Sequence, residues 1–458
     1  MIERVENLGL LVGECGISGE TVADGRCPGM GSIIPLSANR WLLVYSTRDY
    51  RFRYATRSLI YQLRADTPVG PVIREGRLVG SDDAPGSSDD QTKLRTEHGC
   101  ATMFGVPKGA LIAGKPAPNA NLFALKWYTV GTELVELPSP SEDAAAHFRR
   151  VSKMGHTQWL QFRLNDRGDD IEIIQPARLL RQTGCETGSN IGFTPDGEPL
   201  HRMISSNVDP VLANGDCTQW GEVNRFDQGL RAAVAYQFNP TRGAYEWTRT
   251  GPVIQLDNPR VSAGWTSLVR TPTDWVVAIQ KAPFTWPIPP QNTDSDSDGL
   301  DPDEKGVVWI RTQDLWRSSP AAVYPTEPAM YASPVTAYRC ADGIVRLFGG
   351  DQTLCAPPRG CRHPLRCWDI NPDNGFSATN HRVIFDAFKA GLHLHPRSAT
   401  EPEKTPAASK ARVITHAGGN EQYILYLVTL RPEEMAEAGL YCDKLIYDRE
   451  YPGRWTFQ

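Results

Sequence analysis

A recurring hairpin pattern constrains the fold of this chain more than any other feature of its sequence. Each copy has a strand, a short turn such as PKG, PDG or ADG, and a second strand rich in apolar residues. Turns of this composition are strong hairpin signals. The copies lie at residues 28–46, 98–116, 188–206, 262–280 and 333–351, with a weaker sixth copy at 409–429. They recur irregularly, roughly 60 to 90 residues apart.

Each hairpin is followed by more polar strand-like runs, so the repeating unit is a sheet of four strands. We expect an all-β chain that folds as one six-bladed β-propeller over residues 1–458, with apolar hairpins lining the channel and polar strands facing solvent. Stacked β-sandwiches are the alternative. The expected blades span residues 22–79, 95–180, 185–256, 260–318, 331–386 and 408–458. Residues 1–20 either close the ring against the last blade or belong to a seventh sheet.

Helical patterns are scarce, and the best are residues 141–155 and 432–439. In the first of these, Ser141 is suited to an N-cap. Four segments interrupt the strand rhythm and are expected to be long loops, where function tends to lie. They are residues 80–93, 136–148, 283–305 and 396–409.

The charge and hydropathy of the chain narrow its partners and its compartment. The chain has 458 residues and a formal net charge of -5, which argues against nucleic acid or an anionic membrane as a partner. No apolar run approaches the ~20 residues of a membrane helix. The first residues lack a basic start followed by an apolar core, so a cytoplasmic protein is expected, or a secreted or periplasmic one whose leader has been removed. The oligomeric state is left open.

Residues 25–50 resemble the opening of the sialidase-like six-bladed propellers, the neuraminidase or BNR-repeat group. That family begins with Arg-Ile-Pro on its first inner strand, followed by a hairpin and a loop aspartate. Arg26-Cys27-Pro28 occupies the first place here, and Asp49 lies near the second. The resemblance implies a carbohydrate-active enzyme with a carbohydrate substrate.

This chain departs from the family pattern at several places. The Asp-box turns are degraded, and only Arg26 matches the three arginines that hold a sialidase substrate. Residues 264–266 read Gly-Trp-Thr where a supporting glutamate is expected. The resemblance therefore favours a related glycoside hydrolase, or a lyase on the same scaffold, over a true sialidase.

Glycoside hydrolysis generally needs two carboxyl groups, one acting as acid and the other as base or nucleophile. On a propeller they should lie at the starts of inner strands or on loops over the channel mouth. Asp49, Glu97, Glu186 and Asp351 fit this description, and the alternative for each is a solvated loop carboxylate. They predict an exo-acting glycoside hydrolase with its pocket at the channel mouth.

His98 supports a second hypothesis. A histidine at the channel end of an inner strand can act as a general base at neutral pH. In a lyase acting on uronate-containing glycans, His98 and Tyr50 would remove the proton next to the carboxyl group, and Arg26 would neutralise that group. A non-catalytic carbohydrate-binding propeller is the third hypothesis.

Arginine and tryptophan residues supply candidate contacts to the sugar. Arg26 and Arg48 could pair with an acidic sugar, because the guanidinium fork matches a carboxylate. Trp265 and Trp286 are candidate stacking platforms. Core packing is expected instead for Trp41, Trp159, Trp247, Trp275 and Trp309.

Two segments contain residue types that bind metals. Asp294, Asp296 and Asp298 have calcium-loop spacing with Gly299 at position six, but position twelve is Lys305, so a calcium ion and a flexible acidic loop both stay open. No other cofactor is expected.

Residues 355–367 contain three cysteines and His363. Structural zinc, a Cys355–Cys361 disulfide and free thiols are all open there, and Cys367 is expected in a strand. The position of this segment, after the fifth hairpin, favours a rim loop in which Arg362 and His363 touch substrate.

Overall fold

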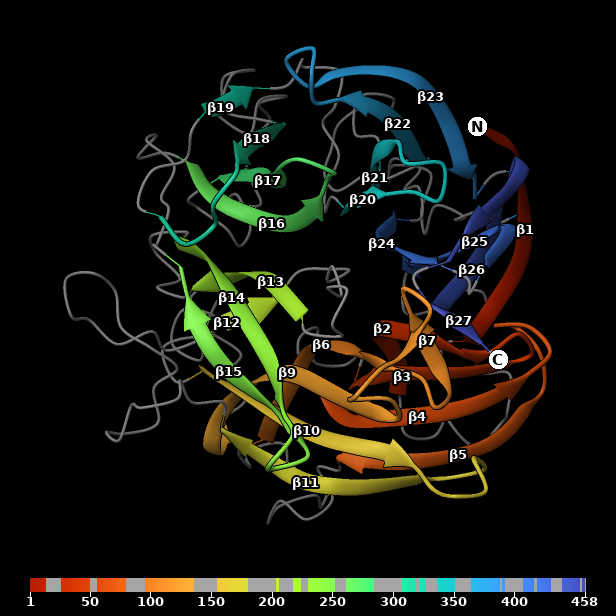
Figure 1. The fold of residues 1–458 in the computed structure, drawn as a ribbon, viewed down its shortest axis with the longest axis vertical. Helices are drawn as coiled ribbons and strands as arrows, with labels where there is room; N and C mark the ends of the chain where they lie inside the picture. The colour runs from red at the N-terminus through yellow and green to blue at the C-terminus, as the bar shows by residue number, and fades with distance from the viewer. Residues whose placement is uncertain are drawn as a thin grey trace, which may run out of the picture.

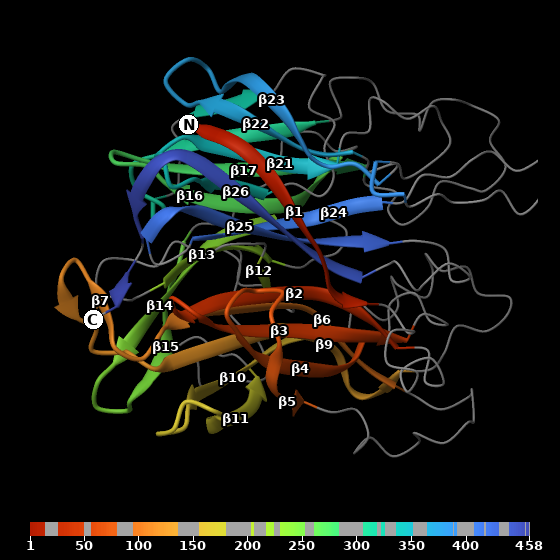
Figure 2. The same ribbon diagram turned by 90° about the vertical axis from the view of Figure 1, so that its right-hand side faces the viewer.

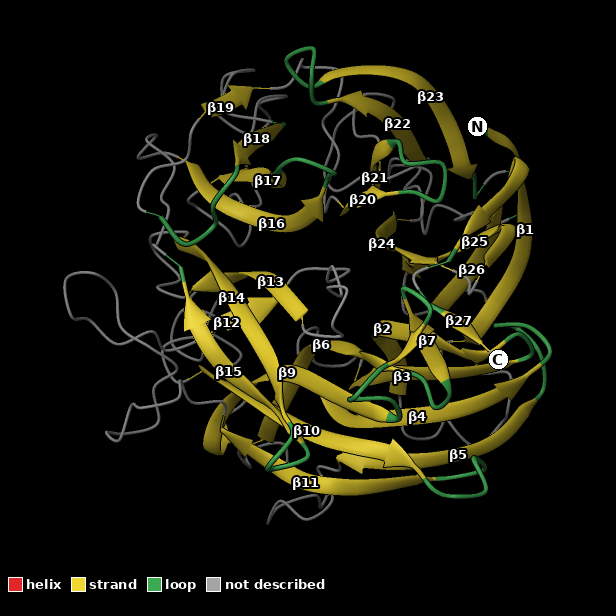
Figure 3. Ribbon diagram, viewed as in Figure 1, coloured by secondary structure: helices red, strands yellow, loops and turns green. Residues whose placement is uncertain are grey.

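The structure consists of β-strands and the turns and short loops that join them. The computed structural model describes residues 1–13, 26–49, 56–79, 95–135, 155–179, 203–205, 217–223, 230–251, 261–283, 306–317, 322–325, 336–350, 364–387, 389–391, 407–415, 418–429, 439–453 and 455–457. Within these ranges there is no helix, and the prediction of an all-β chain is confirmed (Figure 3). The two expected helices lie outside these ranges, except for their residues Gly155 and Gly439, which begin strands.

The strands form six antiparallel sheets of four, which follow one another in chain order around the view of Figure 1. The first sheet contains β2 (Arg26–Ser37), β3 (Arg40–Asp49), β4 (Thr56–Ala65) and β5 (Val72–Val79). The second contains β6 (Arg95–Val106), β9 (Leu122–Val135), β10 (Gly155–Leu164) and β11 (Ile171–Leu179). The third contains β12 (Met203–Ser205), β13 (Cys217–Val223), β14 (Leu230–Asn239) and β15 (Ala244–Thr250).

The remaining three sheets have the same order of strands, and the last of them recruits a strand from the beginning of the chain. The fourth contains β16 (Val261–Arg270), β17 (Trp275–Pro283), β18 (Val307–Thr312) and β19 (Ala322–Pro325). The fifth contains β20 (Thr336–Arg339), β21 (Val345–Gly350), β22 (Leu365–Asn371) and β23 (Ser377–Phe385). The sixth contains β24 (Ala407–Thr415), β25 (Gly418–Thr429), β26 (Gly439–Pro452) and, at its outer edge, β1 (Ile2–Gly13). Of the two expectations for the first twenty residues, pairing with the last sheet is confirmed for β1.

The predicted hairpins in the first, fourth, fifth and sixth sheets are confirmed by the pairing of their first two strands. The prediction for residues 98–116 is wrong, because β6 pairs with β9 rather than with the run after the PKG turn. That run forms a small hairpin of β7 (Ala110–Ile112) and β8 (Lys115–Pro116). Gly109 and Gly114, with φ of 73° and 75°, turn the chain into and through it.

The β7–β8 hairpin belongs to a separate three-stranded sheet whose third member is β27 (Thr456–Phe457). Figure 2 shows this small sheet projecting on one side of the larger ones. Of the predicted hairpin at residues 188–206, the structure describes only β12, so the hairpin itself stays a prediction. β12 pairs with β13, a strand that the sequence pattern did not mark. Residues 188–202 lie outside the described ranges.

The second strands of the sheets are buried on both faces, as β3 shows. Leu42 and Val44 pack into a core cluster with residues of the second sheet, while Trp41, Leu43 and Tyr45 pack into a cluster with the sixth. All five have relative exposures of 7% or less. Successive side chains of a strand point to opposite faces of its sheet. A strand whose sheet is packed on both faces therefore has a continuous run of apolar residues.

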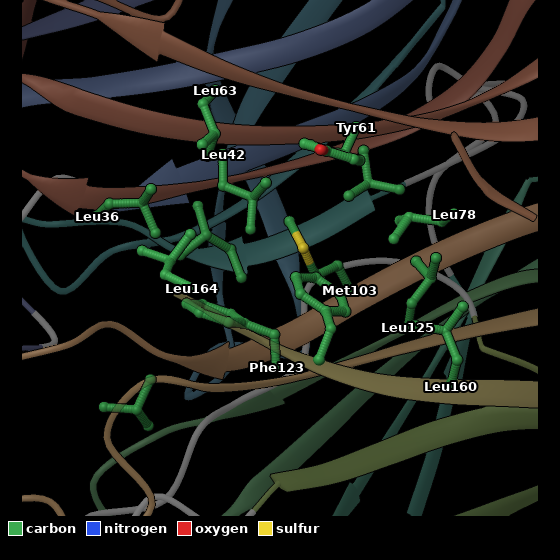
Figure 4. Packing of buried hydrophobic residues seen from close by; sticks show 14 of the residues in the cluster. Leu36, Leu42, Tyr61, Leu63, Leu78, Met103, Phe123, Leu125, Leu160 and Leu164 are labelled. Carbon is green, nitrogen blue, oxygen red and sulfur yellow. The ribbon is translucent and has the colours of Figure 1, made fainter. Parts of the chain in front are cut away.

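Apolar clusters of this kind fill the spaces between neighbouring sheets. Figure 4 shows part of the cluster between the first and second sheets, where Leu42 and Leu63 meet Phe123 and Leu164. Other clusters join the fourth sheet to the third and fifth, the fifth to the sixth and the sixth to the first. Phe104 and Tyr236, with ring centroids 5.1 Å apart, join the second to the third. The sheets therefore support one another in chain order.

The described part of the chain contains no helix that is long and apolar enough to cross a bilayer.

Candidate functional site

Arg26, Arg48 and Asp49 meet at one corner of the first sheet. Arg26 begins β2 and lies directly opposite Asp49, which ends β3, and the next pair in the register is Cys27 and Arg48. Three residues singled out from the sequence are thus brought together by backbone pairing. Tyr50, the partner of His98 in the lyase hypothesis, lies outside the described residues.

Glu97 and His98 occupy a comparable position in the second sheet. They lie near the start of β6, opposite Val130 and Thr129 of β9. Trp265 lies in β16, in the stretch between Ala263 and Thr266 over which the register with β17 shifts.

A bulge at the same level recurs in the first strands of four sheets. The register shifts between Pro28 and Gly31 in β2, Gly99 and Thr102 in β6, Ala263 and Thr266 in β16, and Ser409 and Arg412 in β24. The predicted residues Arg26, Glu97 and His98 all precede the bulge of their own strand. Bulges redirect the strand and its side chains and are common at rims and beside active sites.

Immediately after these four bulges, and also at the start of β20, the first strands carry a layer of buried polar side chains. Ser32, Thr102, Ser267, Thr336 and Arg412 have relative exposures between 0% and 6%. Such residues are unusual in a β-strand core, where a polar group is stable only if it is hydrogen-bonded. We call these five residues the polar layer.

Arg412 holds much of the polar layer together. Its Nη1 donates to Ser32 Oγ at 2.7 Å, and its Nη2 donates to Thr102 Oγ1 at 3.3 Å. Ser32 Oγ also accepts from the backbone N–H of Met103 at 3.3 Å, and the hydroxyl of Thr336 donates to the carbonyl of Ala411. One guanidinium in the sixth sheet thereby contacts the first strands of the first and second.

The sequence interpretation missed Arg412. It is a single arginine in the run SKARVIT, and its only signal is a charge in a strand that is otherwise expected to be buried. Nothing local indicates that it reaches Ser32, which is 380 positions away.

The remaining predicted site residues lie outside the described ranges. They are the candidate catalytic residues Glu186 and Asp351, the candidate sugar contacts Trp286, Arg362 and His363, and the candidate calcium ligands Asp294, Asp296 and Asp298. In the described ranges, no group of three or more histidines, cysteines or acidic residues is placed to hold a metal ion.

The structure shows three cysteines as free thiols. Cys340, Cys367 and Cys442 are free and buried. Cys367 lies in β22, as expected, and burial raises the pKa of its thiol to about 12. A neutral buried thiol behaves as a small apolar group, which is the structural role expected for most of the cysteines. Cys355 and Cys361 lie outside the described ranges.

Among the five tryptophans expected in the core, Trp41, Trp159 and Trp309 are buried, with exposures of 0% to 3%. Trp275 is half-buried, and its ring packs beneath the guanidinium of Arg270 at 4.9 Å. The core prediction is confirmed for the three buried rings.

Comparison with known proteins finds similarity at the level of the fold. No family model and no curated protein matches the sequence. A protein of unknown function from Dyadobacter fermentans aligns with a TM-score of 0.53 and 12% identity over 97% of this chain and 100% of its own. A Trypanosoma rangeli sialidase in complex with the inhibitor DANA aligns with a TM-score of 0.53 and 8% identity over 92% of this chain.

The chain spans about half of that sialidase, 55% of its length. An α-L-arabinanase of Penicillium chrysogenum, complexed with arabinobiose, has a TM-score of 0.48 and 11% identity over 97% of this chain and 98% of its own. The likeness to the sialidase, at 8% identity, shows a shared fold.

Proposed function

We propose that the six sheets are the blades of one β-propeller and that the chain is an exo-acting glycoside hydrolase. The fold-level likeness to a sialidase supports the reaction class. The apolar contacts between successive sheets, including those between the sixth and the first, support the circular arrangement.

The observation that carries the proposal is the pairing of Arg26 with Asp49 before a bulge that recurs in β6, β16 and β24. If the first strands run around one channel, these strand starts converge at one mouth. A pocket there would place an arginine beside a carboxyl group and close to Glu97. That combination suits an acidic terminal sugar.

The roles follow from the chemistry of glycoside cleavage. One carboxyl group protonates the leaving oxygen, and the other acts as base or nucleophile. Asp49 and Glu97 are the proposed pair, with Glu186 and Asp351 as the further candidates. Arg26 is proposed to bind the carboxylate of the sugar.

The other predicted residues keep supporting roles in the proposal. They are Arg48, Tyr50, Trp265, Trp286, Arg362 and His363 as substrate contacts, and Asp294, Asp296 and Asp298 as a structural calcium loop.

One observation favours a lyase as the second candidate. His98 is adjacent to Glu97 on the same side of the bulge, near the start of β6. A histidine there could remove a proton next to a uronate carboxyl group.

A glycan screen of the purified protein separates the candidates. Reducing ends without ultraviolet absorbance indicate a hydrolase, whereas absorbance from an unsaturated uronate indicates a lyase. Binding without turnover supports a non-catalytic carbohydrate-binding propeller. If the protein neither binds nor cleaves any glycan, all three hypotheses are contradicted.

Substitution of the paired carboxyl groups tests their roles. Asp49→Asn and Glu97→Gln should each lower kcat/KM on the substrate that the screen finds, by about 10²- to 10⁴-fold, because positioned acid–base groups contribute that much. Steady-state kinetics measure the effect.

Glu172→Gln is the matched control, since Glu172 is exposed on the outer strand β11 and pairs with Arg163 at 2.8 Å. It should leave kcat/KM unchanged. Retention of activity in Asp49→Asn and Glu97→Gln would move the assignment to Glu186 and Asp351, which the same exchanges then test.

A further inference from the structure

A buried carboxyl group lies inside the sixth sheet, away from the proposed site. Asp443 is on β26, opposite Asn7 of β1 and Ile424 of β25, and its relative exposure is 0%. Alternation along the strand puts it on the same face as Tyr441 and Leu445. Both belong to the apolar cluster between the fifth and sixth sheets.

The known partners of this carboxyl group are neutral. The hydroxyl of Tyr426 donates to Asp443 Oδ2 at 3.0 Å. The backbone N–H of Leu8 donates to the carboxyl group as well. Oδ1 is buried and has no hydrogen-bond partner within the described part of the chain.

The contact with Leu8 ties the carboxyl group to β1. The register between β1 and β26 shifts between Asn7 and Gly9, so Leu8 is the extra residue of a bulge. Gly9 has a φ of 92°, which favours glycine. Asp443 thus accepts the backbone N–H at the point where β1 departs from regular pairing.

The charged groups of the surrounding strands have other partners. Lys444 Nζ pairs with Glu421 at 3.0 Å, and the guanidinium of Arg346 in the fifth sheet pairs with Asp342 and Asp369. In the first sheet, Arg64 bonds to Gln62 and to the carbonyl of Leu11.

The other titratable groups around Asp443 are uncharged at neutral pH. Tyr426, Tyr447 and the thiols Cys340, Cys367 and Cys442 all have pKa values raised chiefly by burial. The ring of Tyr441 packs in the same apolar cluster. No ion pair to Asp443 is present among the described residues.

We propose that Asp443 is a pH-sensitive latch that holds β1 against the sixth sheet when its carboxyl group is protonated and loosens β1 when it is ionised. A neutral carboxyl group suits the aromatic interface, whereas a carboxylate there has too few donors and no cation.

The direction of the pH effect follows from linkage. Burial raises the pKa of Asp443 from 3.8 to about 7, while the hydrogen bonds from Tyr426 and Leu8 oppose this rise. In the closed state β1 is paired with the sixth sheet, and in the open state it has separated from it. Below about pH 4 the carboxyl group of Asp443 is protonated in both states. Between about pH 4 and pH 7 opening releases a proton, so the stability of the closed state falls as pH rises and is constant above that range.

Hydrogen exchange of the β1 amides in the full chain tests the latch. Protection factors, corrected for the intrinsic rate, should fall by at least about tenfold between pH 5 and pH 7 and level off above pH 8. In Asp443→Asn this fall should disappear, and β1 should be more protected at pH 8 than in the wild type.

Glu450→Gln removes an exposed carboxyl group from the same strand and should keep the wild-type pH dependence. Tyr426→Phe provides a second variant, because loss of a donor to the carboxylate should move the inflection to higher pH. A wild-type profile that Asp443→Asn leaves unchanged, or that Glu450→Gln abolishes, would overturn the latch.

Discussion

At the scale of single residues, the fifth sheet contains a fully buried ion-pair network. Arg346 has a relative exposure of 0%, and its Nη1 and Nη2 donate to the two carboxylate oxygens of Asp342, both at 2.7 Å. Its Nε donates to Asp369 Oδ1 at 2.7 Å. Burial alone would lower the pKa of Arg346, but the hydrogen bonds with Asp342 raise it overall, so the guanidinium is charged. Charges this deep are stable only together.

Arg346→Met should therefore destabilise the protein strongly. Among the cations of the described residues, the substitution leaves Asp369 with only Arg382, at 3.2 Å, and Asp342 with only the N-terminal ammonium group, at 3.9 Å. Removing one partner of a buried ion pair is expected to lower the free energy of unfolding by about 3–5 kcal/mol at pH 7. Urea denaturation at pH 7 measures the loss.

Arg317→Met is the matched control for this exchange. Arg317 pairs with Asp314 at 3.1 Å, but its side chain is 85% exposed. A surface pair contributes at most about 1 kcal/mol, so this variant should stay close to the wild type. Equal losses in the two variants would show that burial of the network does not matter.

At the scale of elements, β1 and β26 approach so closely that one position excludes a side chain. Gly439 begins β26 with a φ of 146° and pairs with Gly13 of β1. A Cβ at this position would overlap the carbonyl oxygen of Val12 and lie 3.0 Å from the Cα of Gly13. Both obstacles are backbone atoms, so relief requires the strands to separate.

Gly439→Ala should lower the free energy of unfolding by more than about 1 kcal/mol, because alanine is strained at this φ and also collides with the neighbouring strand. Amide exchange in β1 should speed up as its pairing with β26 is disturbed. Chemical denaturation and hydrogen exchange report the two effects.

Gly419→Ala, in β25 of the same sheet, separates the collision from the strain. Gly419 has a φ of 102°, but a Cβ there meets no atom within 4 Å. It should destabilise less than Gly439→Ala and leave exchange in β1 unchanged. A larger effect at Gly419 would contradict the close approach of β1 and β26.

At the scale of the whole molecule, the sixth sheet is joined to the first by both apolar and polar contacts. The apolar cluster between them includes Trp41, Leu43 and Leu425. In the polar layer, Arg412 bonds to Ser32 and Thr102. These contacts connect segments that are hundreds of residues apart. Their contribution to the free energy of unfolding therefore shows how strongly the sixth sheet is held to the first.

A double-mutant cycle can measure this connection. Arg412→Met and Ser32→Ala should each be destabilising, and the pair should show a coupling energy between about 0.5 and 3 kcal/mol, as expected for bonded neighbours. Urea denaturation of the four proteins supplies the cycle.

Ser37→Ala is the control for additivity. Ser37 lies at the other end of β2, where its hydroxyl donates to Asn39 at 3.0 Å. Its effect should add to that of Arg412→Met within about 0.5 kcal/mol. If the effects of Ser32→Ala and Arg412→Met were also additive, the hydrogen bond between Arg412 and Ser32 would contribute nothing to stability.

Locally determined features could be predicted from the sequence. The hairpins β2–β3 and β20–β21 follow from turn residues and from apolar alternation, both of which act over a few positions. The burial of Trp41 and Trp309 follows in the same way from their apolar strands. Glu97 and His98 could be chosen because they come just before a recognisable apolar run, and Arg26 because its segment resembles a family motif; all three lie near the starts of β6 and β2.

The pairing of distant segments was decided only by the tertiary structure. The PKG turn predicted a hairpin over residues 98–116, yet β6 pairs with β9, and the intervening hairpin pairs with β27 near the other end of the chain. Arg412 gave no local signal that it contacts Ser32, and Asp443 none that it accepts a bond from Leu8. The physical reason is range: turn geometry and side-chain alternation are set by neighbouring residues, whereas strand partners are selected by which buried faces and polar groups fit together after collapse.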